Sequence, residues 1–415
     1  MTPDPPRQRP EGAFLVTVSG LDRPGSAADL FAALEQAGAD VLDVEQVTIF
    51  GQLLLAVVVV GVDQGVLQDA VAPLTPTWGL AVAVNPTDLG ASPPPHHHHW
   101  LTVLAPTLPA AALAGVFGAV ARAGGNVERI VQLAHQPVVS YELLVAGAGS
   151  DELRRQVAQE AARLRIDVAV QRAGLHRRAR HLIVLDVDST LIRQEVVDLL
   201  AERAGCAQQV AEITRAAMAG ELEFAEALRA RVQLLAGLPA STLEEVRQSL
   251  ELTPGARTLV RTLARLGYET AVVSGGFLQV IEPMAADLGI RRVAANRLEV
   301  ADGRLTGRLL GPIVDRAGKA EALRRFAAEA GVPLAQTVAV GDGANDIDML
   351  SVAGLGIAFN AKAVVQDAAD AALNVPYLDP ILYLLGVPRS EIEAADEPER
   401  PEGVSARTSA SLGSA

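Results

Sequence analysis

The stretch HLIVLDVDSTLI, residues 181–192, constrains the fold most, because an apolar run leads directly into two aspartates. The apolar residues 182–185 predict a buried strand of a parallel sheet. Asp186 and Asp188 follow this strand at once. Two like charges at the end of a buried strand are unfavourable unless a cation or a proton offsets them. The stretch therefore predicts a functional site at the end of a sheet strand.

The region around this strand, residues 181–387, alternates between strand and helix patterns, which is typical of a doubly wound parallel sheet. Residues 193–252 interrupt the alternation with helical patterns alone, so we expect a helical cap over the strand ends. Ligands of open α/β sheets bind at the carboxyl ends of the strands. The fold class predicted for this region is therefore α/β, with strands at residues 181–186, 269–273, 292–294, 337–341 and 355–358.

Polar side chains also follow three other predicted elements. TAVVSGG ends in Ser274 and Gly275 before a helix, where a hydroxyl and free backbone N–H groups suit a phosphate. DRAGKAEAL brings Lys319 to the start of another helix, where alone it would be a solvated lysine. TVAVGDGANDIDML indicates a site more specifically, because Asp342 and Asn345 follow an apolar strand. Together these motifs predict one site.

The aspartates of the first and last motifs predict a metal site. Asp186 and Asp342 end strands that can be neighbours in the sheet, so we expect their carboxylates to converge. Oxygen ligands without histidine or cysteine fit Mg²⁺, which commonly accompanies phosphate. Asp348 of the last motif is expected to be an exposed helix residue instead. The alternative, that these aspartates only cap loops, explains each motif separately but not all of them together.

The first 170 residues contain a duplication. FLVTVSG begins at Phe14 and WLTVLAP at Trp100, and the helix ends AGADV and AGGNV place Asp40 and Asn126 at the same separation of 86 residues. Equal separations for a strand and a helix end indicate two copies of one unit. Each copy has the order βαββαβ, which packs helices on one face of an antiparallel sheet. The elements of the first copy are expected at about 14–19, 27–37, 41–49, 53–62, 64–73 and 79–85.

The composition restricts the class of protein. A net charge of −14 and a pI near 5.0 argue against a nucleic-acid surface. The single cysteine, Cys206, allows no internal disulfide. Residues 1–12 lack the apolar core of a signal peptide, and the apolar run at 53–62 is too short to span a bilayer. We therefore expect a cytoplasmic protein.

Three segments are expected to lie outside the folded domains. PTDLGASPPPHHHHW links the two copies, and its histidines, His96–His99, are expected to be a solvated coil rather than a metal site. The basic run at 171–181 is expected to be a solvated connector. The tail at 388–415 has almost no large apolar residues and is expected to be disordered. The expected domains are 12–86, 99–171 and 181–387.

The four motifs of the α/β domain together resemble those of the haloacid dehalogenase superfamily of phosphotransferases. DVDST matches the first motif, Ser274 the second, Lys319 the third and GDGAND the fourth. Within the superfamily the sequence is most similar to the phosphoserine phosphatase family. Glu195 follows the first motif at that family's spacing, and Arg231 lies where the family holds its substrate carboxylate. The resemblance implies Mg²⁺-dependent hydrolysis of O-phospho-L-serine to L-serine and phosphate, the last step of L-serine biosynthesis.

The resemblance also implies a role for each site residue. Asp186 is the nucleophile that forms an aspartyl phosphate, and Asp188 is the general acid and base. The metal ligands are the side chains of Asp186 and Asp342 and the backbone carbonyl of Asp188, and Asp346 supports the metal waters. Arg231 suits the substrate carboxylate because its planar fork donates two bonds. The substrate contacts are expected from Glu195, Arg231, Ser274, Gly275, Lys319, Asn345, Met218 and Phe224, of which Glu195 suits the substrate ammonium.

The duplicated unit resembles ACT-type regulatory domains, which bind amino acids in metabolic enzymes. The first copy has GLDRPG (Gly20–Gly25) at the turn from strand to helix, as in that family, whereas the second has APTLPA there. The resemblance implies an amino-acid effector, and we expect the reaction product L-serine in that role. We also expect a homodimer. A structural alternative is that the pair serves only as a dimerisation platform.

Two other functions stay open at this point. The α/β domain could belong to another phosphatase or phosphotransferase of the superfamily that acts on a small phosphate ester. Glu195 and Arg231 argue against this, because a sugar phosphate presents no ammonium and carboxylate pair. From a different class, the protein could be an amino-acid sensor whose phosphatase domain is degenerate, which the intact set of motifs disfavours.

Overall fold

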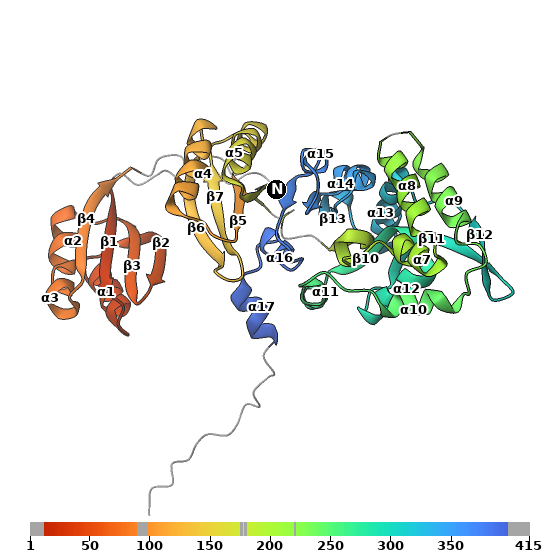
Figure 1. Cartoon of the computed structure of the whole chain (residues 1–415). Helices are drawn as coiled ribbons and strands as arrows, with labels where there is room; N and C mark the ends of the chain where they lie inside the picture. The colour runs from red at the N-terminus through yellow and green to blue at the C-terminus, as the bar shows by residue number, and fades with distance from the viewer. Residues whose placement is uncertain (1–11, 89–97, 175–176, 178–180, 220, 397–415) are drawn as a thin grey trace, which may run out of the picture. The chain divides into compact units, whose positions relative to one another are not determined.

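The computed structural model describes residues 12–88, 98–174, 177, 181–219 and 221–396 (Figure 1). The chain divides into two compact units at Pro94, and each is considered by itself. The first unit contains the first copy of the duplicated motif. The second unit contains the second copy together with the α/β domain. No helix in the described ranges is long and apolar enough to cross a membrane.

The first copy folds in the order that the sequence predicts, with a short additional helix. Its elements are β1 (Ala13–Leu21), α1 (Ser26–Gln36), β2 (Asp40–Ile49), β3 (Gln52–Val60), α2 (Gln64–Val71), α3 (Leu74–Trp78) and β4 (Ala81–Thr87). The strands pair antiparallel in the order β2-β3-β1-β4. Val16 and Val57 of the sheet pack with Leu30 and Leu67 of the helices. Burial alternates along most of β3, although nearly all of its residues are apolar, which places this core on one face of the sheet.

The second copy repeats this fold and confirms the duplication. Its elements are β5 (His99–Ala105), α4 (Ala110–Arg122), β6 (Asn126–Ala134), β7 (Val139–Ala146), α5 (Ser150–Leu164) and β8 (Asp167–Arg172). The strands pair antiparallel in the order β8-β5-β7-β6. Leu101 and Val103 of the sheet pack with Val116 and Val157 of the helices.

The α/β domain is built on the strand that the sequence singled out. β9 (Leu182–Asp186) pairs in parallel with β10 (Glu269–Phe277) on one side and with β13 (Thr337–Gly341) on the other. Residues 182–185 are fully buried on both faces of the sheet, so helices cover it on both sides. The remaining strands are β11 (Arg292–Ala301), β12 (Arg304–Leu310), β14 (Leu355–Phe359) and β15 (Ala371–Leu373).

Helices form the cap and the flanks of this domain. The predicted cap consists of α7 (Val196–Ala204), α8 (Ala207–Met218), α9 (Phe224–Gln233) and α10 (Ser241–Gln248). The flanking helices are α11 (Ala256–Arg265), α12 (Leu278–Asp287), α13 (Arg316–Ala330), α14 (Ile347–Val352), α15 (Ala363–Gln366), α16 (Ile381–Leu384) and α17 (Arg389–Asp396). The helical insertion after the first strand is thus present as expected.

The sheet extends beyond the expected strands at both edges. At one edge β12 pairs antiparallel with β11 as a hairpin. At the other edge β15 pairs antiparallel with β8 of the second copy, through Ala371 and Ala169. One eleven-stranded sheet therefore runs in the order β12-β11-β10-β9-β13-β14-β15-β8-β5-β7-β6. The sequence did not indicate β15, because three residues are too few to show a period of two.

The expected disorder of the tail is wrong for its first part. Arg389–Asp396 form α17, and the remaining residues of the tail lie outside the described ranges. Ile392 is buried, and Asp396 forms ion pairs with Arg261 and Arg265 of α11. One apolar anchor and two ion pairs thus hold a helix whose composition is otherwise polar.

The expected solvated connector is wrong for Gln171 and Arg177, although Arg172, Gly174 and His181 are exposed as expected. Gln171 is buried on β8 and donates a hydrogen bond to the carbonyl of Leu384 at 2.6 Å. Arg177 forms an ion pair with Glu142, and its guanidinium lies 5.3 Å from the centre of the Trp100 ring. These basic and polar residues connect the second copy to its surroundings rather than to solvent.

The histidine tract is not a solvated coil at its C-terminal end. His99 begins β5, is buried, and its Nε2 lies 2.7 Å from the hydroxyl of Ser150. The ring of His98 lies 3.0 Å from the carboxylate of Glu128. Both contacts fall within the second copy, so these two residues serve its fold; residues 96–97 lie outside the described ranges.

Candidate active site

Two carboxylates lie where β9 ends and the chain turns through Val187–Leu191. Asp186 and Asp188 are both buried. Asp188 accepts hydrogen bonds from the backbone N–H of Val196 at 2.8 Å and from the hydroxyl of Ser274 at 2.7 Å. Burial raises the pKa of Asp188, although these two hydrogen bonds act in the opposite direction. Asp188 therefore holds a proton more readily than an exposed aspartate does.

Lys319, near the start of α13, lies between two buried carboxylates. Its Nζ is 2.7 Å from Oδ1 of Asp186 and 2.6 Å from Oδ1 of Asp346. Burial alone would lower the pKa of Lys319, but the two carboxylates hold it above its usual value. Burial, and then Asp346, raise the pKa of Asp186 well above its usual value, against the opposing effect of Lys319. One ammonium therefore does not balance the negative charge of this cluster.

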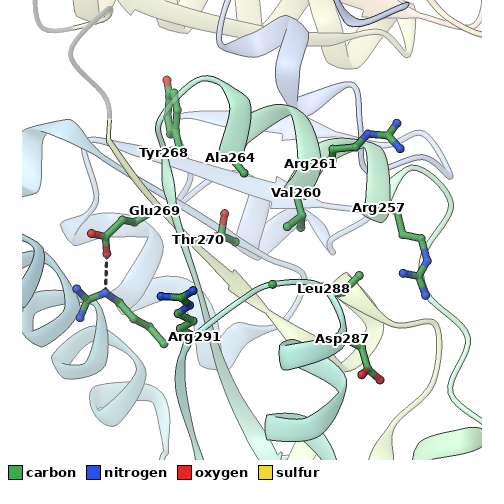
Figure 2. Close-up of a pocket in the computed structure, with 12 residues that line it drawn as sticks. Arg257, Val260, Arg261, Ala264, Tyr268, Glu269, Thr270, Asp287, Leu288 and Arg291 are labelled. Carbon is green, nitrogen blue, oxygen red and sulfur yellow. Dashed lines mark hydrogen bonds and ion pairs between the residues drawn. The ribbon is translucent and has the colours of Figure 1, made fainter. Parts of the chain in front are cut away.

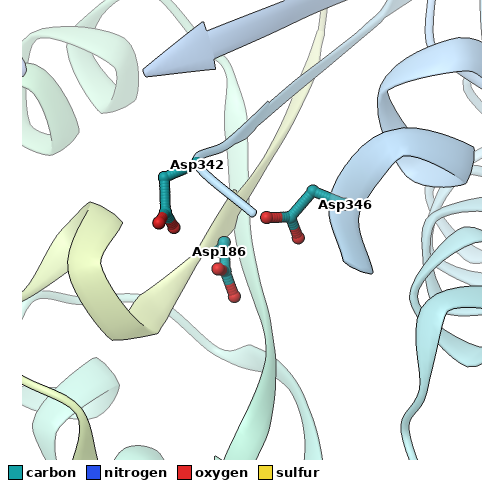
Figure 3. A group of neighbouring side chains, drawn as sticks. All are labelled: Asp186, Asp342 and Asp346. Atoms are coloured by element: carbon teal, nitrogen blue, oxygen red, sulfur yellow. The ribbon is translucent and has the colours of Figure 1, made fainter. Parts of the chain in front are cut away.

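A third carboxylate completes a group that can hold a metal ion. Asp186, Asp342 and Asp346 each offer one oxygen atom, and these atoms lie within 4.8 Å of one another (Figure 3). Burial, followed by the charge of Asp346, raises the pKa of Asp342 to about 6, while the hydroxyl of Thr190 donates to it at 3.1 Å. A divalent cation would remove the repulsion that these shifts express.

The structure brings together the two aspartates that the sequence assigned to a metal. Asp346, expected only to support metal-bound waters, lies in the same group of carboxylates. The carboxylate of Asp188 is not part of it, because it is occupied by Ser274 and a backbone N–H. The assignment of the Asp188 backbone carbonyl as a ligand stays a prediction.

A cavity of about 610 Å³ opens over these groups, between the strand ends and the cap. It brings together most residues that the sequence proposed for the site. Its wall includes Asp186, Asp188, Glu195, Phe224, Arg231, Gly275, Lys319, Asp342 and Asn345. Ser274 is fully buried behind the wall and reaches the site through its bond with Asp188. Met218 ends α8, and its side chain lies outside what the structure describes.

The cap end of the cavity carries one acid and one base. Glu195 precedes α7 and accepts a hydrogen bond from the hydroxyl of Ser189 at 2.9 Å. Burial, and then the charge of Asp188, raise the pKa of Glu195 to about 7. Arg231 donates to the hydroxyl of Thr214 at 3.4 Å, and burial lowers its pKa. Among the described residues neither group forms an ion pair, so both remain available to a ligand.

Two glycines allow the wall to close around these groups. A Cβ atom at Gly275 would lie 3.2 Å from the ring of Phe224. A Cβ atom at Gly276 would lie 2.9 Å from Oδ2 of Asp188 and 3.0 Å from the hydroxyl of Ser274. A side chain at either position would displace a functional group, which explains the Gly-Gly pair after Ser274.

Several residues of the cavity wall could not be predicted from the sequence pattern. Thr214 of α8 holds Arg231, and Asn360 and Lys362 come from the loop after β14. A signal for Lys362 existed, because Lys319 and Lys362 are the two lysines of the whole sequence. Both line this cavity. Lys362 stands in an alanine-rich loop that matches none of the motifs, so the residues around it did not indicate a site.

A larger cavity, of about 820 Å³, lies elsewhere on the domain (Figure 2). It is lined by α11, the end of α12 and the start of β10, which is the amino end of the strand. Both of its acidic residues are paired, Glu269 with Arg292 at 2.6 Å and Asp287 with Arg247 at 2.8 Å. Ligands of such sheets bind at the carboxyl ends, and none of the predicted site residues lies here. The smaller cavity is therefore the candidate active site.

Comparison with known families agrees with this geometry. Residues 183–351 match the model of haloacid dehalogenase-like hydrolases, and residues 13–76 and 97–171 each match a model of ACT domains. A Streptomyces coelicolor protein named phosphoserine phosphatase is 52% identical over 92% of this chain and 94% of its own length. A Mycobacterium tuberculosis protein of that name is 51% identical over 92% of this chain and 95% of its own length.

A solved structure resembles both the catalytic region and part of the N-terminal half. A probable phosphoserine phosphatase from Vibrio cholerae has a TM-score of 0.55 and 31% identity, over 72% of this chain and 88% of that one. The match extends beyond the α/β domain, because that domain is about half of the chain.

Proposed function

The chain belongs to the phosphoserine phosphatase family of haloacid dehalogenase-like hydrolases, and on this premise we propose a mechanism in which Mg²⁺ and named residues hydrolyse O-phospho-L-serine. One observation carries the proposal. A single cavity has a cluster of carboxylates with Lys319 at one end and the pair Glu195 and Arg231 at the other. The first end suits a metal-bound phosphate, and the second suits an ammonium and a carboxylate.

Mg²⁺ would be held by Asp186, Asp342 and the backbone carbonyl of Asp188, with Asp346 close by. Hard carboxylate oxygens without histidine or cysteine fit this ion. When bound, it supplies positive charge to the phosphoryl oxygens. Lys319 supplies a second positive charge, and Ser274, Gly275 and Asn345 are proposed to donate hydrogen bonds to the same oxygens.

Asp186 and Asp188 divide the chemistry between them. A carboxylate oxygen of Asp186 attacks phosphorus, and the bond from phosphorus to the serine oxygen breaks. Asp188, whose burial favours its protonated form, gives its proton to the leaving serine oxygen. Asp188 then takes a proton from a water molecule that attacks the phosphorus of the aspartyl phosphate. Phosphate leaves, and the carboxylate of Asp186 is restored.

The cap end selects the amino acid. The guanidinium of Arg231 is proposed to bind the substrate carboxylate and Glu195 to bind the ammonium, while Phe224 and Met218 pack over the substrate. Phe224 lines the cavity beside Gly275, where a Cβ atom on the glycine would lie 3.2 Å from its ring. A phosphate ester without both charges leaves Glu195 or Arg231 buried without a partner, which is unfavourable.

A phosphate-release assay over a panel of phosphorylated metabolites tests this proposal. We expect O-phospho-L-serine to have the highest kcat/KM, with activity lost in a chelator and restored by Mg²⁺. A preference for a sugar phosphate would make the protein another phosphatase of the superfamily. No turnover of any ester with Mg²⁺ present would indicate a degenerate domain and a sensor function.

We further infer that the N-terminal half binds an amino acid, with L-serine as the first candidate. ACT domains generally bind amino acids, and both copies match such models. An effector changes activity only if it binds the two activity states with different affinity, typically by ~1–3 kcal/mol. Serine inhibition is therefore to be compared in the full-length protein and in a truncated protein that begins near Arg178. Identical inhibition in both would leave the N-terminal half a structural role.

We also infer a homodimer in the cytoplasm. Every residue of β2 is exposed, including the apolar Val41, Leu42, Val44, Val47 and Ile49. An exposed apolar edge strand favours association with another chain. Analytical ultracentrifugation of the full-length protein and of the Val47→Glu variant tests the dimer, and cell fractionation tests the location.

A further inference from the structure

Lys362 is a positive charge on the cavity wall that the mechanism above does not use. It lies directly before α15, in the loop that follows β14. Lys319 is held by two carboxylates, whereas Lys362 is exposed and has no ion pair with any residue in the described ranges. Since β14 pairs in parallel with β13, which Asp342 directly follows, the loop lies at the end of the site that has the carboxylate cluster. An unpaired ammonium there suits a phosphate.

The loop that carries Lys362 is held in place by hydrogen bonds. Asn360 has a φ of 46°, in the left-handed region that asparagine adopts more readily than most residues other than glycine. Its backbone N–H donates to the carbonyl of Leu373 at 2.8 Å, and its side-chain amide donates to the carbonyl of Val375 at 3.2 Å. The loop therefore depends on the segment around β15, which is the strand that joins the second ACT-type domain.

A chain of side-chain hydrogen bonds leads from this loop into the second ACT-type domain. Gln366 donates to the carbonyl of Ala361 at 2.6 Å and to Oδ1 of Asn374 at 2.9 Å. Asn374 in turn donates to both carboxylate oxygens of Asp167, from its backbone at 2.8 Å and from its side chain at 2.7 Å. Asp167 begins β8 and is buried. Ala361 is the residue next to Lys362.

We propose that Asp167 is a positioning residue for the active site: through Asn374 and Gln366 it fixes the loop that places the Lys362 ammonium on the substrate phosphate. The inference rests on the proposed phosphatase function. It assigns Lys362 a substrate contact. It also means that the second ACT-type domain fixes the position of a loop in the wall of the catalytic cavity, whether or not that domain binds an effector.

A second contact across the same junction provides a matched control. Arg154 of α5 forms an ion pair with Asp370 at 2.9 Å, and Asp370 accepts from the backbone N–H of Gly356 at 3.0 Å. This path ends within β14 and does not reach Ala361. Arg154→Ala should therefore weaken the junction without changing the position of Lys362.

The test is a double-mutant cycle on the full-length protein with O-phospho-L-serine. We expect Lys362→Ala to lower kcat/KM about tenfold, mainly through KM, and Lys362→Arg to lower it less. Asp167→Ala should lower kcat/KM roughly threefold in the wild-type background and not at all in the Lys362→Ala background, because the two act through one contact. Arg154→Ala should leave kcat/KM unchanged.

Gln366→Leu repeats the test without altering the ACT-type domain, in case Asp167→Ala fails to fold. The decrease in kcat/KM that Gln366→Leu causes should also vanish in the Lys362→Ala background. The inference would be overturned if the losses of kcat/KM multiply when Asp167→Ala or Gln366→Leu is combined with Lys362→Ala. It would also be overturned if Arg154→Ala lowers kcat/KM as much as Asp167→Ala does. An inactive wild-type protein would instead refute the proposed function, so the two failures are distinguishable.

Discussion

At one end of the cavity Lys319 is held between Asp186 and Asp346, with both bonds shorter than 2.8 Å. At the other end Arg231 donates only two long bonds of 3.4 Å, to the hydroxyl of Thr214 and to the carbonyl of Ala227. The first set of charges is paired and almost completely buried. The second set consists of Arg231, on the cap helix α9, and Glu195, which directly precedes the cap helix α7. Neither residue forms an ion pair in the described part of the chain.

This difference separates two tasks. Groups that stabilise a transition state act best when the fold has already oriented them, because no reorganisation is then needed during the reaction. Groups that select a substrate gain from being unpaired, because the correct ligand alone satisfies them. We call the end with Asp186, Asp346 and Lys319 the carboxylate end, and the end with Glu195 and Arg231 the cap end. The carboxylate end should therefore control turnover for every phosphate ester, and the cap end should control only the preference for phosphoserine.

The largest expected effect is the loss of turnover in Asp186→Asn. The amide has the same shape as the carboxylate but is a poor nucleophile, so phosphate release should fall to background for O-phospho-L-serine and for an aryl phosphate alike. The thermal midpoint should not fall, because the substitution removes one charge from a cluster with excess negative charge. Activity near that of the wild type would exclude the covalent mechanism.

Asp188→Asn should have the next largest effect, a decrease in kcat of ~10²–10⁴-fold. The decrease should be greater for O-phospho-L-serine than for an aryl phosphate, because a serine alkoxide needs a proton in order to leave and a phenolate needs it less. Steady-state kinetics on both substrates measure the ratio. Equal decreases would mean that Asp188 does not protonate the leaving group.

The two ends also differ in how far the sequence predicted them. The carboxylate end follows from local patterns, because Asp186 ends β9, Ser274 lies near the end of β10 and Asp342 directly follows β13. Parallel pairing of β9 with β10 and β13 then brings them together without further information. Glu195 precedes α7 and Arg231 lies on α9, in helical segments where charged residues are usually solvated, so only the family resemblance indicated them.

Contacts between distant segments could not be read from the sequence. The pairing of β15 with β8 joins residues 371 and 169 through a strand too short to give a pattern. The contact between Asp167 and Asn374 depends on that pairing. The helix α17 was missed because Ile392 anchors it with the help of ion pairs from another helix.

Arg231→Lys tests the cap end directly. A lysine keeps the charge but not the planar fork, so the loss of a bidentate contact should cost ~1.5–3 kcal/mol in kcat/KM for O-phospho-L-serine. Turnover of an aryl phosphate, which presents no carboxylate, should change little. Comparable losses on the two substrates would show that Arg231 supports the cavity as a whole and does not select the amino acid.

The smallest expected effect concerns the pH dependence of the cap end. Burial, and then Asp188, raise the pKa of Glu195 to about 7, so the carboxylate is mostly protonated at pH 6 and mostly ionised at pH 8. Only the ionised form pairs with the substrate ammonium. The ratio of kcat/KM for O-phospho-L-serine to that for an aryl phosphate should therefore rise with pH, by at most about tenfold between pH 6 and 8 from the ionised fractions.

Taking this ratio cancels the titration of Asp342, on which both substrates depend alike, but not that of Asp188, on which the two leaving groups depend differently. Glu195→Gln is the matched control, since it keeps the size of the side chain and cannot ionise. In that variant the ratio should be low at pH 8 and should no longer rise with pH. A rise that persists in Glu195→Gln would place the titrating group at the carboxylate end, and the separation of tasks between the two ends would then be wrong.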